Sequence, residues 1–229
     1  MKKYIVNNRN KGFIYLLMSF IALVVFPFYF GNSLSEFDYP QKRLLYFYFS
    51  PKVFLILHFW TLVYMYNPVK KTLLNSIVVI RVIEDIQWLK LVLKNTISLA
   101  VEYTIIWSLM TTSIYFIEFR VMNKDEIIQT ILSSLVFFIG IVLFLLFYLL
   151  LTIYLKTWVS FILLLLTILL DFTLYSFFNS KGFFLTWLNV FLDTSQVVFF
   201  IKVSYLILAS SIIILFSIKK FNKLEFLGD

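Results

Sequence analysis

Residues 127–155 read IIQTILSSLVFFIGIVLFLLFYLLLTIYL, a run without a single charged side chain. A helix needs about 20 mostly apolar residues to cross a hydrocarbon core about 30 Å thick. This segment is longer than that minimum, and the charged residues Lys124-Asp125-Glu126 and Lys156 flank it. We therefore interpret residues 127–155 as a helix that crosses a membrane.

Five other apolar runs are long enough for the same interpretation. They cover residues 13–30, 44–66, 96–117, 158–178 and 197–218. A further run, 183–192, is too short to cross, and we interpret it as a re-entrant or interfacial hairpin on the outer side. The predicted fold is an all-α membrane protein with about six transmembrane helices in a single transmembrane domain, 1–229.

Composition supports lipid as the main solvent. Hydrophobic residues make up 62% of the chain and charged residues 14%, against roughly 45–50% and 25% in soluble domains. The chain has no cysteine and one histidine, so we expect no disulfide and no metal site. The net charge of +8 comes from residues in short segments between apolar runs. That placement favours contact with anionic lipid headgroups, and we expect no nucleic-acid partner.

The distribution of basic residues predicts the orientation. With the N-terminus in the cytoplasm, thirteen of the 20 Lys and Arg residues fall on the cytoplasmic side. Positive charge is enriched in the cytoplasmic loops of membrane proteins. We therefore expect a multi-pass protein of the plasma membrane with both termini in the cytoplasm.

Glycine and proline positions bear on nucleotide binding and on transport class. A phosphate-binding loop needs two glycines five residues apart followed by Lys and Ser or Thr, and the five glycines are too widely separated for this. If ATP drives the protein, another subunit must bind ATP and Mg²⁺, and this chain needs no cofactor. All four prolines lie in the first third. The last four spans therefore lack the breaks typical of ion-coupled transporters, which disfavours that class.

The connector between the second and third spans contains an amphipathic segment, 76–94. Arg81, Glu84 and Asp85 gather on one side at helical spacing, and apolar residues lie opposite. This pattern predicts a helix lying along the cytoplasmic membrane surface. Lys90 and Lys94 interrupt the apolar face, so we expect a change of direction there, into the third span.

Within this segment, residues 80–90 (IRVIEDIQWLK) are similar to the coupling helix of type-2 ABC exporter permeases. The layout resembles that family too: six spans, both ends inside, a cytoplasmic helix between spans two and three, and a short apolar hairpin before span six. One departure is that only twelve residues precede the first span, where many members begin with a long amphipathic helix. The small permeases that this chain resembles in composition serve bacteriocin immunity and peptide export in Gram-positive bacteria.

The resemblance implies a mechanism and partners. Two permeases, identical or different, would pair, and each would dock its cytoplasmic helix on an ABC ATPase subunit. ATP-driven closure of the ATPases would open an outward path between the first, second and fifth spans. The implied ATPase contacts are Arg81, Glu84, Asp85, Trp88 and Lys90; a surface helix that only anchors at the headgroups is the alternative reading.

Two carboxylates fall within predicted spans, Asp171 in the fifth and Glu102 in the third. A charge at mid-bilayer costs a few kcal/mol, on the order of 2.5–3.5 on insertion scales, so both side chains should face protein or water. They are candidates for a translocation path that binds a cationic part of a substrate. Alternatively they help helices pack, and Glu102 could extend to the interface. We interpret His58, midway along the second span, as a hydrogen-bonding packing residue, with a proton relay as the alternative.

Catalysis is not expected. Intramembrane proteolysis needs paired aspartates, a Ser–His pair or His/Glu metal ligands. The paired carboxylates, Glu84-Asp85 and Asp125-Glu126, are adjacent in sequence and point apart on a helix. The alternatives to an exporter permease are a non-transporting sensor or assembly subunit and a secondary transporter.

Overall fold

The computed structural model describes Ile14, Tyr15, Leu17, Ile21 and residues 53–74, 85–119, 122–178 and 196–221. Every regular element in these residues is helical: a π-helical segment η2 (Phe54–His58) and the α-helices α5 (Phe59–Leu73), α7 (Asp85–Phe119), α8 (Lys124–Tyr154), α9 (Thr157–Phe178) and α10 (Gln196–Phe221). The predicted all-α fold is confirmed for this part of the chain. The predicted hairpin 183–192 and most of the first span lie outside it.

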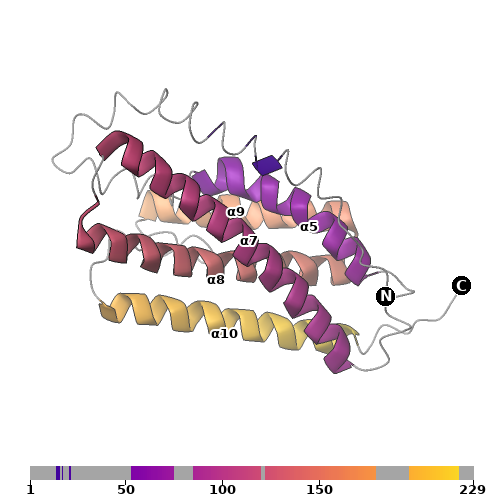
Figure 1. Ribbon diagram of the computed structural model, residues 1–229. Coiled ribbons are helices and arrows are strands. Elements are labelled where there is room, and N and C mark those ends of the chain that lie inside the picture. The colour runs from indigo at the N-terminus through magenta and orange to yellow at the C-terminus, as the bar shows by residue number, and fades with distance from the viewer. Residues whose placement is uncertain are drawn as a thin grey trace, which may run out of the picture.

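Helix α8 is the centre of the bundle. It packs against α5, α7, α9 and α10, and Figure 1 shows it running alongside α10, with α7 crossing over it. Its middle section is buried on all sides, with Val136, Phe137, Ile141, Phe144 and Leu149 all in the core. A helix that is apolar around its whole circumference is stable only when neighbours cover it, and this sequence places α8 inside.

Successive helices run in alternating directions (Figure 1). One end of the bundle therefore collects the end of α5, the start of α7, the α8–α9 junction and the end of α10. Most lysines of the described helices lie at that end: Lys70, Lys71, Lys90, Lys94, Lys156, Lys219 and Lys220. The opposite end has Lys124 and Lys202. The bundle is thus strongly basic at one end.

The outer faces of the helices are apolar. On α7, Ile97, Val101, Ile105 and Leu109 recur every four residues and are all exposed. Helices α9 and α10 turn large side chains outward as well, among them Leu166, Leu170, Ile207, Leu208 and Leu215. Soluble proteins rarely expose continuous apolar surface on this scale, so these faces require a lipid or protein environment.

Two described helices are long and apolar enough to cross a membrane, Gln87–Ile117 in α7 and Glu126–Tyr154 in α8. The corresponding apolar parts of α9 and α10, Thr157–Asp171 and Val203–Ser217, are shorter. Together with the apolar outer faces, these helices indicate a membrane location.

Two helix boundaries differ from the sequence prediction. α7 is continuous from Asp85 to Phe119, whereas we expected a change of direction near Lys90 and Lys94. No Gly or Pro interrupts that stretch, so the helical hydrogen bonds continue through it. α5 extends to Leu73 through Pro68, beyond the predicted span end at residue 66, although a proline inside a helix removes one backbone donor.

Candidate functional site

The second and third predicted spans share a buried polar cluster of His58, Thr61 and Tyr103. His58 Nδ1 lies 2.7 Å from the Tyr103 hydroxyl, and that hydroxyl lies 2.8 Å from Thr61 Oγ1. Thr61 also reaches the Leu57 carbonyl oxygen at 2.8 Å. His58 is 1% exposed and Tyr103 is equally buried. The prediction of a hydrogen-bonding His58 is confirmed, and its partner comes from α7.

The direction of these hydrogen bonds can reverse. Each hydroxyl has one proton, so one arrangement runs from His58 Nδ1–H through Tyr103 and Thr61 to the Leu57 carbonyl. In the other, Thr61 donates to Tyr103 and Tyr103 donates to His58 Nδ1. The histidine tautomer selects between them. Such a chain can pass a change in protonation from one side chain to the next.

Aromatic rings surround the His58 imidazole. Trp107 lies edge-on at 4.3 Å between ring centroids, Phe137 at 5.0 Å and Phe54 at 5.8 Å. His58 is also the last residue of η2. Short π-helical turns are frequent at functional sites. The local backbone and the ring packing together fix the position of the imidazole.

Glu102 adjoins this cluster. It precedes Tyr103 on α7 and is half-buried. Its carboxylate interacts electrostatically with the hydroxyl of Tyr15, which in turn is close to the Tyr103 hydroxyl. Glu102 therefore faces protein, as expected for a carboxylate within a span.

Asp171 has different neighbours. It is 2% exposed and continues the buried face of α9 formed by Ser160, Leu164 and Ile168. Its carboxylate interacts electrostatically with Tyr205 of α10. The structure therefore places Asp171 at the α9–α10 side of the bundle, whereas Glu102 has Tyr15 and the His58 cluster as neighbours.

Other hydroxyls inside the bundle have unused hydrogen-bonding capacity. Thr104, Ser133 and Ser210 have buried oxygens with no hydrogen-bond partner in the part of the chain that the structure describes. They come from α7, α8 and α10, which pack against one another. Buried polar atoms of this kind usually bind water or a ligand.

Of the implied ATPase-contact residues, Trp88 and Lys90 lie in the described part of α7, at the basic end. Trp88 is fully buried, and its indole N–H donates to the Leu73 carbonyl oxygen at 3.3 Å. Lys90 is exposed. Arg81, Glu84 and the Asp85 side chain lie outside the described residues. The Trp88 bond joins the start of α7 to the end of α5.

A second cationic group at this end is buried. Lys70 Nζ donates to the Tyr148 hydroxyl at 3.2 Å and lies 4.7 Å from the centroid of that ring. Tyr148 in turn donates to Asn67 Oδ1 at 3.0 Å. Burial, and then the neighbouring charge of Lys71, lower the pKa of Lys70 below its usual value. The pattern of apolar runs did not predict this residue as buried.

The buried carboxylate of Glu126 has a structural role. It is buried and accepts hydrogen bonds from the Tyr115 hydroxyl at 2.5 Å and the Asn123 amide at 2.8 Å. The bond from the Asn123 backbone N–H is part of the capping box at the start of α8, and the bond from Tyr115 joins α7 to α8. Among the described residues no group of three His, Cys, Asp or Glu side chains could hold a metal ion.

No family model matches the chain, and neither a curated protein nor a solved structure shows significant similarity to it. Sequence reasoning missed Tyr103, Thr61 and Tyr205. The spacing of Thr61 three residues after His58 on one helical face was the available signal for a polar face on the second span.

Proposed function

We propose that this chain is the membrane-spanning permease subunit of an ATP-driven exporter of the type-2 ABC class. The observation that carries the proposal is the buried polar cluster of His58, Thr61 and Tyr103 next to Glu102, inside helices whose outer faces are apolar. Titratable and polar groups inside a membrane bundle are costly and typically belong to a transport path.

The basic end of the bundle supports a cytoplasmic orientation for the α5–α7 connection and the α8–α9 junction. Lysine-rich ends face the cytoplasm in most membrane proteins. In the six-span arrangement that we propose, residues 75–84 are then cytoplasmic, as docking to a cytosolic ATPase requires. The termini would also be cytoplasmic.

A separate ATPase supplies the energy in this proposal, because the sequence has no phosphate-binding loop. Arg81, Glu84, Asp85 and Lys90 are the proposed contacts. Trp88 links α7, the helix that contains Asp85 and Lys90, to α5 through the Leu73 carbonyl. A displacement at the ATPase would therefore move the ends of α5 and α7 together, and these two helices hold the His58 cluster.

The proposed substrate is an amphipathic or antimicrobial peptide with a cationic part. Asp171, with Tyr205 beside it, would attract that part on the α9–α10 side of the bundle. The hydroxyls of Thr104, Ser133 and Ser210 would accept or donate hydrogen bonds along the way. A second permease, identical or different, would complete the path in the membrane of a Gram-positive bacterium.

The test is purification of the tagged chain from its native membrane in mild detergent. We expect an ATPase subunit to co-purify and its ATP hydrolysis to rise with peptide substrate. The double variant Glu84→Lys/Asp85→Lys should abolish co-purification. Asp125→Lys is the matched control, because it reverses an acidic residue in the first turn of α8 at the opposite end. Undiminished co-purification of the double variant would refute the docking assignment.

A proton-coupled secondary transporter is the second candidate, favoured by the reversible hydrogen bonds between His58, Tyr103 and Thr61. Purified protein in sealed vesicles distinguishes the two. Uptake driven by an imposed pH gradient without any ATPase would favour the second candidate, whereas dependence on ATP and a co-purified subunit favours the exporter.

A further inference from the structure

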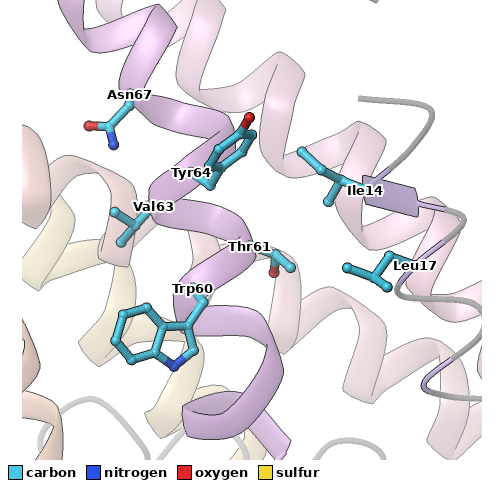
Figure 2. A pocket seen from close by; sticks show the side chains of 7 residues that line it. All are labelled: Ile14, Leu17, Trp60, Thr61, Val63, Tyr64 and Asn67. Carbon is cyan, nitrogen blue, oxygen red and sulfur yellow. The ribbon is translucent and has the colours of Figure 1, made fainter. Parts of the chain in front are cut away.

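One face of α5 forms an open groove with a volume of about 590 Å³. Figure 2 shows Trp60 and Asn67 on one side, Ile14 and Leu17 on the other, and Thr61 and Tyr64 between them. Its walls are mostly apolar and aromatic. Trp60 is 52% exposed and Tyr64 58% exposed, so both rings can contact a ligand lying in the groove.

The side chains on this face of α5 change from aromatic to polar and then charged along the helix axis. Trp60, Tyr64, Asn67 and Lys71 follow one another at spacings of four, three and four residues, which places them on one face of α5. The first two are aromatic, the third is an amide and the fourth an exposed lysine. At 1.5 Å per residue, Lys71 lies about 16 Å from Trp60 along the axis. One leaflet of the hydrocarbon core is about 15 Å thick.

Charge selects the occupant. Lys71 belongs to the basic end of the bundle. The buried Lys70 precedes it, and Lys90, Lys94 and Lys156 lie on neighbouring elements at the same end. A neutral apolar helix of another chain would gain nothing from these charges, and a cationic peptide would be repelled by them. An anionic lipid matches both the apolar groove and the charge one turn beyond Asn67, with its chain on the rings and its phosphate near Lys71.

We propose that this groove is a binding site for an anionic phospholipid, with one acyl chain against Ile14, Leu17, Trp60 and Tyr64 and the headgroup phosphate near Asn67 and Lys71. The site rests on the membrane location of the chain and not on its role as an exporter. Lipid bound here would contact α5 on the turn that contains Thr61, whose hydroxyl also belongs to the His58 cluster.

The experiment measures quenching of Trp60 fluorescence by lipids with brominated acyl chains. The protein is reconstituted in phosphatidylcholine vesicles that contain a minor fraction of either brominated phosphatidylglycerol or brominated phosphatidylcholine. Subtracting the signal of Trp60→Phe isolates Trp60 from the other tryptophans. One lysine near an anionic surface is worth about 1 kcal/mol, so we expect about fivefold enrichment of the anionic lipid at Trp60.

Two variants test the assignment to this groove. Lys71→Gln should remove the excess quenching by the anionic lipid but leave quenching by phosphatidylcholine unchanged. Lys156→Gln, an exposed lysine at the same end on the α8–α9 junction, should leave the excess intact. Equal quenching by the two lipids in the wild type would overturn the proposal, as would an excess that survives Lys71→Gln. Trp60 shielded from both lipids would indicate a second copy of the chain in the groove and would overturn it too.

These measurements need no ATPase. A failed co-purification with an ATPase therefore leaves the lipid site standing, and a failed quenching experiment leaves the exporter proposal standing.

Discussion

Removing the hydroxyl of Tyr103 is the sharpest test of the buried polar cluster. Tyr103→Phe keeps the ring, and with it the packing against Phe137 at 6.5 Å between centroids. It deletes only the oxygen that lies 2.7 Å from His58 Nδ1 and 2.8 Å from Thr61 Oγ1. The effect on stability therefore reports hydrogen bonding alone.

The expected size follows from the partners left behind. Thr61 retains the carbonyl oxygens of Leu57 at 2.8 Å and His58 at 3.1 Å, so it loses little. His58 Nδ1 loses its hydrogen bond to Tyr103 in a buried site, and such a loss costs roughly 1–3 kcal/mol in general. Side-chain bonds between transmembrane helices average about 0.6 kcal/mol and reach about 1.7. We expect Tyr103→Phe to lower the free energy of unfolding by about 1 kcal/mol.

The assay is a double-mutant cycle with His58→Phe, which retains a ring against Trp107. Unfolding is followed by circular dichroism during titration of detergent micelles with sodium dodecyl sulfate. The coupling energy between the two substitutions should be about 0.6–1.7 kcal/mol. Tyr64→Phe on α5 is the control, because its exposed hydroxyl should contribute less than about 0.5 kcal/mol.

A coupling energy within error of zero would refute the reasoning, because the two side chains would then contribute independently. Equal destabilisation by Tyr64→Phe would refute it too, since the effect would not depend on burial.

Three further predictions concern other buried groups. Asp171→Asn should strongly reduce peptide export, because the negative charge is lost. It should change the free energy of unfolding by less than about 1 kcal/mol, because the amide keeps the shape of the carboxyl group and can still form hydrogen bonds. If the variant exports peptide from reconstituted vesicles as well as the wild type does, Asp171 is not part of the path. The pKa of Lys70 is lowered in the folded protein, so the unfolded chain binds this proton more tightly. The wild type should therefore gain thermal stability relative to Lys70→Met as pH rises towards the ordinary lysine pKa. Melting temperatures of both proteins at neutral and alkaline pH check this, and a difference in melting temperature that does not change with pH contradicts it. Trp88→Phe should leave ATPase co-purification intact but reduce the stimulation of ATP hydrolysis by substrate, because the hydrogen bond to the Leu73 carbonyl oxygen is lost. Unchanged stimulation would show that this bond does not couple substrate binding to ATP hydrolysis.

The helices themselves could largely be predicted from the sequence. The predicted segments 127–155, 158–178 and 197–218 coincide within a few residues with α8, α9 and α10. Their limits are visible because charged residues such as Lys124 and Lys156 stand beside apolar runs, and the change in solvent at the membrane surface sets where such runs end.

Helix continuity was harder to predict. Lys90 and Lys94 looked like the end of a surface helix, yet α7 passes through both. Lysine is a good helix former, and its long side chain can reach the headgroups from within a continuous helix. Charge on an apolar face therefore does not by itself indicate a bend.

Contacts between helices could not be predicted at all. His58 and Tyr103 lie 45 positions apart in the sequence, and nothing in either segment specifies the register that brings them together. The same holds for Lys70 and Tyr148. Both carboxylates singled out by their position in the spans, Asp171 and Glu102, do face protein, because hydrocarbon excludes them wherever their helix packs.

The α8–α9 junction has a mechanical consequence. Only Leu155 and Lys156 separate Tyr154 from Thr157, and three peptide units span at most about 11 Å. Backbone hydrogen bonds from the Leu155 N–H to the Leu151 carbonyl oxygen and from the Ser160 N–H to the Lys156 carbonyl oxygen continue the helical pattern into both residues. The end of α8 and the start of α9 must therefore stay close together, and any displacement of α8 at this junction would carry the start of α9 with it.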